Sequence, residues 1–341
     1  MPTSGPEIPL ARLLRRWGLD EPRSLTPLPA DVASTGRSWR LAIGTTTFLL
    51  KEYGDVGRRH ILFRHRVLGA LAETGLPVPA AVPAHDGRSL VTAAGRPYAL
   101  YPWVDGHRRG GLDLSLAQCH QLGELLGRVH AALDALTPPV QQTLLVPTSR
   151  AAAAIAEIDD LLGLLPRDGD DFDALAERRL RERRTLLSGL ADHQPPEIDT
   201  SMVGYVHGDF QAGSLLYGRT RRVTAIVGWG RLAIAPYGGE LVRAATSLFG
   251  HHDERGLDLD RVEAFVAGHA EAFPLDTGQV QSAVHRLWWE RLCDVGALRR
   301  RYLDHAAPGD AALVTWWTEH LERTLDVFAT PYTATSAVHP S

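Results

Sequence analysis

Cysteine is scarce in this sequence, and long apolar runs are absent. The 341 residues include two cysteines, Cys119 and Cys293, which stand far apart and outside any CxxC pattern. We therefore expect neither a disulfide framework nor a structural zinc site, and we expect a reducing compartment. The first residues carry no apolar stretch of the signal-peptide type, and no run reaches the roughly 18 apolar residues of a membrane span. These absences predict a cytoplasmic protein with no membrane partner.

An excess of positive charge is also absent, and lysine is almost missing. The formal net charge is −4, so no basic field favours a nucleic-acid partner. Of the 36 lysine and arginine residues, Lys51 is the one lysine and the other 35 are arginine. If any cation sufficed at position 51, this composition would favour arginine there. Where a motif independently requires a lysine at this position, its retention indicates that a compact ammonium group matters there.

The residue pattern divides the chain into a β-rich part and a helical part, and its length suits two lobes rather than one core. We expect a helical extension over residues 1–22, a β-rich lobe over 23–104 and a helical lobe over 105–335. In the β-rich lobe the pattern predicts three strands, a helix and a hairpin, at 23–29, 38–44, 46–53, 56–73 and 88–104. The other expected elements are helices at 7–19, 114–133, 150–164, 173–190, 238–250, 258–272, 277–303 and 310–329, and a loop with a hairpin over 203–229.

Six short segments carry most of the functional information. In chain order they are FLLKEY (48–53), LGALAETGLPVP (68–79), YALYPWVDG (98–106), LGELLGRVHAAL (122–133), VHGDFQAGSLLY (206–217) and VTAIVGW (223–229). Their order and spacing resemble the aminoglycoside phosphotransferase and choline kinase superfamily, a branch of the protein-kinase-like fold, over about residues 23–330. The resemblance implies an α+β, two-lobed fold with a small antiparallel β lobe, one helix beside it and a large, mostly helical lobe. It also implies a ligand cleft between the lobes.

The resemblance further implies a phosphoryl-transfer site, in which catalysis depends mainly on positioning and charge neutralisation. Lys51 stands where the family's nucleotide-binding lysine is expected. His207 and Asp209 fall in the HGD of the catalytic loop, where Asp209 is the expected base or polar anchor. The expected hinge comprises Tyr101, Pro102, Trp103 and Val104.

The metal-binding part of the motif departs from the family pattern. The family's magnesium-binding Asn falls on Ser214, and the Asp of its Ile-Asp-Trp motif falls on Gly228. No Asp or Glu occurs from residue 210 to residue 239. Magnesium requires oxygen ligands, usually with carboxylates among them. We therefore expect no metal site at these positions and no Mg²⁺ cofactor.

The partner of the lysine is replaced as well. The helix at 56–73 should supply a Glu for Lys51, but FRHRVLGAL places Arg64 or His65 there. Arginine can neutralise phosphate without magnesium, so ATP is retained as a candidate cofactor. Lys51, Arg64 and Ser214 are accordingly the candidate anion-binding or nucleotide-binding residues.

The retained Lys51 and Asp209, together with the lost metal ligands, favour an atypical member of this family. Such a protein would bind or transform a small molecule or peptide in the interlobe cleft, in specialised metabolism, without ordinary Mg·ATP phosphotransfer. One alternative is a genuine kinase for a metabolite or antibiotic hydroxyl, as in antibiotic resistance, with one magnesium ion held by Ser214, water and ATP. A second alternative is a non-catalytic, pseudokinase-like binding or scaffold protein with a protein partner.

Several conspicuous residues are given structural roles. We expect His207 to be hydrogen-bonded within its loop rather than to shuttle protons. Trp229 is expected to pack under the same loop, and Trp288–Trp289 and Trp316–Trp317 to lie in the core. The HHDE segment at 251–254 lacks zinc spacing and is expected to form a solvated loop.

Residues 147–200 stand where the family builds its acceptor-binding helices. They include 12 acidic residues and seven arginines, so their net charge of 7 − 12 = −5 would suit a polycationic antibiotic. The arginines, however, cluster at 178–184 beside Glu177 and Glu182, a pattern typical of a solvated helix with ion pairs. The charge of this segment therefore does not identify an acceptor.

Overall fold

The computed structural model describes residues 10–29, 36–137, 149–166, 168–196, 198, 202–251 and 256–304. The predicted helix at 310–329, Trp316–Trp317 and residues 252–254 lie outside these residues. Contacts group the chain into two units, of which the first comprises residues 1–114, 125–138 and 204–234 and the second residues 115–124, 139–203 and 235–341. The first unit thus joins the β-rich region to the segment that carries the HGD motif.

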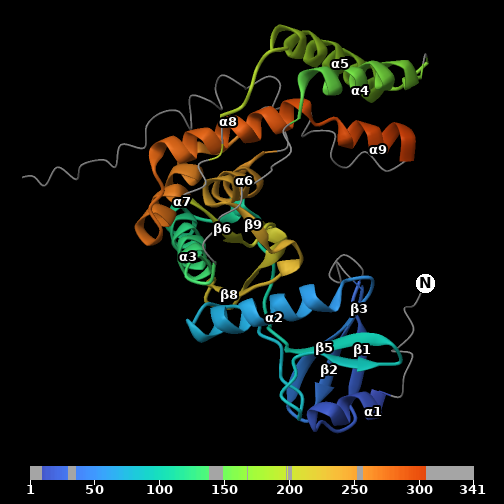
Figure 1. Cartoon of the computed structure of the whole chain (residues 1–341), viewed down its shortest axis with the longest axis vertical. Coiled ribbons are helices and arrows are strands. Elements are labelled where there is room, and N and C mark those ends of the chain that lie inside the picture. Colours follow the sequence, from blue (N-terminus) through green and yellow to red (C-terminus); the bar gives the residue numbers. More distant parts are fainter. Residues whose placement is uncertain are drawn as a thin grey trace, which may run out of the picture. The chain divides into compact units, whose positions relative to one another are not determined.

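An antiparallel sheet of five strands, in the order β1-β2-β3-β5-β4, forms the centre of the first unit (Figure 1). Its strands are β1 (Ser24–Pro27), β2 (Gly36–Ile43), β3 (Thr46–Tyr53), β4 (Val91–Ala93) and β5 (Arg96–Pro102). The β2–β3 turn contains Gly44 at φ 58°, and the β4–β5 turn contains Ala94 and Gly95, both at positive φ. The strands and the hairpin predicted in this region are confirmed.

Helix α2 (Arg58–Glu73) packs against the face of the sheet that carries Lys51. Its buried residues recur at helical spacing and are Ile61, His65, Val67, Leu68 and Leu71. Ile61 packs with Tyr53 of β3 and Tyr101 of β5. Alternate residues of a strand share a face, so Lys51 lies on the same side as Tyr53.

The opposite face of the sheet packs against the N-terminal helix. Within the described part of the predicted span of 7–19, α1 (Leu10–Leu14) continues into a 3₁₀ turn, η1 (Arg15–Trp17), and ends at Gly18 with φ 70°. A left-handed glycine directly after a helix is a common way to end it. Leu13 and Leu14 pack with Trp39, Leu50 and Tyr98 from the sheet.

The HGD motif lies in a segment of short strands and turns, as predicted for 203–229. Strand β7 (Leu215–Tyr217) pairs antiparallel with β8 (Val223–Ile226), and β6 (Val203–Val206) pairs with β9 (Ala233–Pro236). The 3₁₀ turns η4 (Ala212–Ser214) and η5 (Trp229–Arg231) flank the β7–β8 pair. Asp209 therefore lies between β6 and η4, and Gly228 lies immediately before η5.

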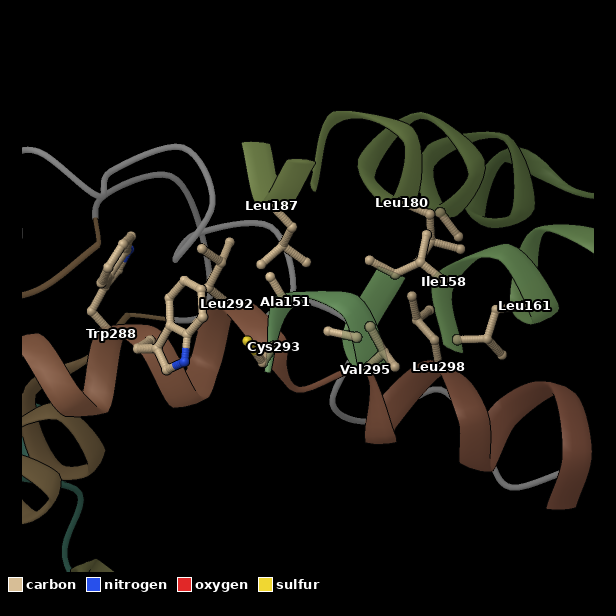
Figure 2. Close-up of a cluster of buried hydrophobic side chains, with 13 residues drawn as sticks. Ala151, Ile158, Leu161, Leu180, Leu187, Trp288, Leu292, Cys293, Val295 and Leu298 are labelled. Carbon is tan, nitrogen blue, oxygen red and sulfur yellow. The ribbon is translucent and has the colours of Figure 1, made fainter. Parts of the chain in front are cut away.

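The second unit is helical. Its helices are the first part of α3 (Leu116–Asp134), α4 (Ala151–Leu164), α5 (Asp171–Gly189), α6 (Tyr237–Phe249), α7 (Leu259–Ala272), α8 (Thr277–Cys293) and α9 (Gly296–Asp304). Figure 2 shows the apolar core shared by α4, α5, α8 and α9, to which Ile158, Leu180, Leu187, Leu292 and Leu298 contribute. Trp288 and Trp289 are buried in this core, as predicted. No described helix is long and apolar enough to cross a membrane.

The prediction of one helix over 277–303 is wrong, because two helices occupy this span. Asp294 adopts an extended conformation between α8 and α9. Its carboxylate accepts a hydrogen bond of 2.8 Å from the Gly296 amide, and its carbonyl accepts one of 2.7 Å from Arg183 of α5. A short acidic side chain that satisfies a free helix-end amide favours such a break.

The arginine-rich part of α5 carries ion pairs, as its sequence predicted. Arg181 pairs with Glu177 at 2.7 Å, Arg179 with Glu182 at 2.9 Å, and Arg184 with Asp159 of α4 at 2.6 Å. Arg183 differs from these residues because it is 2% exposed. Helix α5 is therefore a paired surface helix with one arginine turned into the core.

Candidate functional site

Lys51 is half-buried on the central strand β3 and has no acidic partner. Its ammonium group lies 5.2 Å from the centre of the Tyr53 ring. Burial lowers the pKa of Lys51 to about 8, and the positive charge of Arg64 contributes to this shift. Among the described residues, no carboxylate lies within ion-pair distance of the ammonium group. The lysine is therefore a partly desolvated cation without a counterion among the described residues.

The adjacent carboxylate, Glu52, cannot serve as that counterion because it lies on the other face of the sheet. Glu52 is 1% exposed and pairs with Arg37 at 2.9 Å and with Arg96 at 3.1 Å. The Tyr98 hydroxyl donates a third hydrogen bond to it at 2.6 Å. Glu52 carries no motif signal of its own, although its position next to Lys51 on a strand places it on the opposite face.

Arg64 of α2 stands close enough to Lys51 for its charge to affect that lysine. It lowers the pKa values of both Lys51 and His65. Its Nη2 donates a hydrogen bond of 3.1 Å to the carbonyl of Gly230, in the turn that follows Gly228. Arg64 thus links α2 to the segment where the family's second metal ligand is expected.

A buried network of neutral polar groups joins α2 to strands β3 and β5, close to these two cations. The hydroxyls of Tyr53 and Tyr101 are 2.5 Å apart, and His65 Nε2 lies 3.2 Å and 2.8 Å from them. His65 Nδ1 lies 2.9 Å from Ser89 Oγ. Burial, reinforced by Arg64 and Lys51, lowers the pKa of His65 to about 4, so the ring is neutral near pH 7. No sequence signal identified this network, because it joins α2, β3, β5 and a loop.

The predicted hinge residues lie at the end of β5 and directly after it. Tyr101 points its hydroxyl into the buried network, and Pro102 is exposed. Trp103 and Val104 are half-buried, and the Trp103 indole donates to Asp105 at 2.9 Å. The structure thus gives the Tyr101 side chain a contact with His65. The role of these four residues as a hinge stays a prediction.

His207 fixes the loop that carries Asp209. It is fully buried, and Nε2 donates to the Val227 carbonyl at 2.9 Å while Nδ1 accepts from the Asp209 amide at 3.1 Å. Its ring packs against Trp229 with 4.5 Å between ring centres. Both ring nitrogens are engaged, so this geometry suits a structural role rather than proton transfer.

The carboxylate of Asp209 is half-buried and lightly engaged. Gln211 donates one hydrogen bond of 3.1 Å to Oδ1. The preceding residue, Gly208, has φ 79°, and a Cβ there would lie 2.2 Å from the Arg231 carbonyl. Only glycine fits this close approach, which fixes the backbone before Asp209. A carboxylate held in this way can still accept a proton or a hydrogen bond from a ligand.

The two positions that correspond to the family's magnesium ligands, Ser214 and Gly228, lie side by side. A Cβ built on Gly228 would lie 3.0 Å from Ser214 Oγ. The Ser214 hydroxyl, however, donates to the Asp209 carbonyl at 2.8 Å, and Gly228 supplies no side chain. The described residues contain no group of three or more His, Cys, Asp or Glu that could hold a metal ion. One hydroxyl without a carboxylate does not fit Mg²⁺.

These contacts connect the predicted site residues within the first unit. Arg64 reaches from the vicinity of Lys51 to Gly230, and the same turn places Gly228 against Ser214. Ser214 in turn bonds the backbone of Asp209. The site therefore combines two cations and one carboxylate in a connected framework that has no divalent-metal ligand set.

Comparisons with known proteins identify the family of this chain. A family model described as "Phosphotransferase enzyme family" matches residues 24–275. A homoserine kinase of Pseudomonas aeruginosa (strain LESB58) is 37% identical over 90 residues, which span 26% of this chain and only 27% of that kinase. A homoserine kinase of Janthinobacterium sp. (strain Marseille) is 22% identical over 341 residues, or 96% of each protein.

A solved structure of a known phosphotransferase has a similar fold. Spectinomycin phosphotransferase in complex with ADP and spectinomycin has a TM-score of 0.61 and 14% identity, covering 94% of this chain and 97% of that one. This likeness confirms the predicted kinase-like α+β fold. Because the family model matches most of the residues, the chain belongs to the phosphotransferase enzyme family.

Proposed function

We propose that this protein binds a phosphate-bearing small molecule through Lys51 and Arg64 without a divalent metal ion. It does not catalyse ordinary Mg·ATP phosphotransfer. The observation that carries the proposal is the replacement of the expected Lys–Glu ion pair by two neighbouring cations. The second metal position beside them, Gly228, has no side chain.

Charge complementarity supports an anionic ligand. Two neighbouring positive charges repel each other, and the repulsion and burial together lower the pKa of Lys51 to about 8. A phosphate group in contact with both would replace repulsion with two charge-assisted interactions. Arginine is suited to phosphate because its planar guanidinium can donate two parallel hydrogen bonds. Arg64 would thereby supply positive charge that the family normally takes from magnesium.

The absence of acidic residues near the metal positions argues against ordinary phosphotransfer. No Asp or Glu occurs from residue 210 to residue 239, and Ser214 already donates its hydroxyl proton to the Asp209 carbonyl. A metal ion in such enzymes neutralises charge that develops as the phosphoryl group moves. Without ligands for it, the rate would fall by several decades.

Asp209 is proposed to hold or deprotonate a polar group of the ligand. Its Oδ1 accepts from Gln211, which leaves further acceptor capacity on the carboxylate. His207 is proposed to position this loop, because its two ring nitrogens are hydrogen-bonded to the loop backbone. Whether the ligand is transformed therefore depends on Asp209 rather than on His207.

A genuine small-molecule kinase is the second candidate. Two relatives are homoserine kinases, and the structural neighbour binds ADP together with its substrate. The Ser214 hydroxyl lies 3.0 Å from the Cβ position of residue 228, so the backbone still brings the two metal positions together. This candidate requires one magnesium ion held by Ser214, water and ATP.

Charge-reversal variants on helix α2 test the proposal. ADP binding is measured by calorimetry in EDTA for the wild type, Arg64→Glu and Arg66→Glu. Arg66 is a matched control because it lies on the same helix and is exposed. We expect Arg64→Glu to weaken binding about 100-fold, the loss of a strong charged hydrogen bond, and Arg66→Glu to weaken it less than about threefold.

Two results would overturn the proposal. One is that ADP does not bind in EDTA, or binds equally well to all three proteins. The other is magnesium-dependent ATP consumption, with homoserine, spectinomycin or an amino alcohol as acceptor, that Asp209→Ala abolishes. That second result would establish the kinase candidate. Metal-free binding without turnover would instead identify a binding protein.

A further inference from the structure

We infer that His65 is a positioning residue: the neutral network of Ser89, His65, Tyr101 and Tyr53 fixes α2 to the sheet and holds Arg64 and Lys51 in place. This inference rests on the proposed function for its ligand-binding part. In it, a set of hydrogen bonds replaces the ion pair that the family uses to tie its helix to the lysine strand.

The network spans every element around the two cations. His65 comes from α2, Tyr53 from β3, Tyr101 from β5 and Ser89 from the loop before β4. Four heavy-atom separations of 2.5 to 3.2 Å join them, and all but Ser89 are buried. A buried polar network in which every ring nitrogen and hydroxyl has a partner rigidifies its surroundings.

The network also reaches both cations directly. Arg64 is the residue before His65 on α2, so the orientation of the His65 ring constrains the backbone that carries Arg64. Lys51 rests over the ring of Tyr53, with 5.2 Å between its nitrogen and the ring centre. The hydroxyl at the far end of that ring is bonded to Tyr101 and His65. A shift of His65 therefore moves both groups that the proposal assigns to phosphate.

Neutral partners are the ones that suit this position. Lys51 and Arg64 are the charged groups that face His65, and its other neighbours are Tyr53, Tyr101 and Ser89. A carboxylate here would neutralise Lys51 and compete with an incoming phosphate. A neutral imidazole anchors the helix and leaves the positive charge for the ligand.

The test uses four variants and two readouts. Tyr101→Phe and His65→Leu remove hydrogen bonds, and His65→Gln keeps an acceptor near the place of Nε2. Tyr98→Phe is the matched control, because it removes a buried hydroxyl from the same strand on the opposite face, where it bonds Glu52 at 2.6 Å. The readouts are metal-free ADP affinity and the pH dependence of Lys51 labelling by an amine-reactive reagent. Lys51 is the only lysine, so peptide mass spectrometry reports its reactivity alone.

We expect Tyr101→Phe and His65→Leu to weaken ADP binding about tenfold or more and His65→Gln to recover most of that loss. In the first two variants the apparent pKa of Lys51 should rise toward its ordinary value, because Arg64 is no longer held near it. Tyr98→Phe should change neither readout while still lowering stability to urea. Loss of stability in Tyr101→Phe with both readouts unchanged would overturn the inference.

The labelling readout separates this inference from the proposed function. If the wild type does not bind ADP, the proposed function fails, but the Lys51 labelling profile still reports positioning. If the wild type binds ADP and Arg64→Glu does not, while Tyr101→Phe and His65→Leu match the wild type in both readouts, the proposed function stands and the inference fails.

Discussion

Strand β3 carries a carboxylate on one face and a lysine on the other, and among the described residues only the carboxylate has oppositely charged partners. On one face, Glu52 is almost fully buried and its charge is neutralised by Arg37 and Arg96, with a further hydrogen bond from Tyr98. On the other face, Lys51 has Arg64 as its charged neighbour. The first arrangement is complete within the chain. The second lacks a negative charge among the described residues, and under the proposed function a bound phosphate supplies it.

The largest expected loss of stability comes from removing the charge of Glu52. Glu52→Gln removes the charge of a side chain that is 2% exposed and that accepts charge-assisted hydrogen bonds from Arg37 and Arg96, whose side chains are 27% and 44% exposed. Weakening these two bonds should cost about 3 kcal/mol. Urea unfolding measures the loss. The control is Glu177→Gln, which removes an exposed pair with Arg181 and should cost less than about 0.5 kcal/mol. A similar, small loss in both variants would show that Glu52 is not a structural hub.

Lowering the pH should reduce the free energy of unfolding through protonation of His65. The folded pKa is about 4, below the ordinary 6.5, so the unfolded chain binds the proton first as the pH falls. The contribution of neutral His65 is complete above about pH 6.5 and is lost as the pH falls to about 4, by on the order of 3 kcal/mol.

The measurement is the pH dependence of the unfolding free energy for the wild type and His65→Gln. The variant lacks the titrating ring, so its stability should fall less between pH 6.5 and 4. Parallel curves for the two proteins would contradict the assignment of a low pKa to His65.

Alkali should weaken phosphate binding at the same face. The pKa of Lys51 is about 8 without ligand, and a bound anion stabilises the charged form. Above that pH, the site must take up a proton to bind, so affinity should fall by up to about tenfold per pH unit. Calorimetry in buffers of different ionisation enthalpy should detect this proton uptake near pH 9. Affinity that stays constant from pH 7 to pH 9.5 would contradict the role of Lys51.

The smallest expected effect on stability comes from substituting Gly228, which has no ligand-binding role in the proposed function. Gly228→Ala should cost about 1 kcal/mol because φ is 84°. Gly44→Ala is the control: it has φ 58° but nothing within 4 Å of its Cβ, so a larger cost at Gly228 reports the contact with Ser214. Gly228→Asp places a carboxylate beside the proposed phosphate site, so it should weaken metal-free ADP binding and should not raise native activity. A large, magnesium-dependent gain would instead indicate a kinase that lost one ligand.

Much of the fold could be predicted because its elements have clear periodicity and turn residues. The strands around Lys51 and the helix that carries Arg64 were of this kind. The break at Asp294 was missed, because the periodicity continues across it and the buried Arg183 that bonds its carbonyl is distant in sequence. The helical spacing of Ala176, Leu180 and Leu187 places position 183 on the buried face of α5, but local sequence does not identify the Asp294 carbonyl as the partner of Arg183.

The site was predictable where a motif fixed a position and not where tertiary contacts did. Lys51, Asp209, Ser214 and Gly228 were located by the spacing of short segments. The partners of His65 depend on the register of β3 against β5 and on the loop that carries Ser89. Local sequence determines neither the strand register nor the position of this loop. The hydrogen-bond network around His65 could therefore be identified only in the structure.

The central claim is that the positive charge of Lys51 and Arg64 serves a phosphate group without a metal ion. The most direct test is calorimetric ATP binding to the wild type and to Lys51→Ala, each in EDTA and in Mg²⁺. We predict wild-type affinities within about threefold in the two conditions, and loss of binding in Lys51→Ala in both. Binding that requires Mg²⁺, or that persists in Lys51→Ala, would contradict the account.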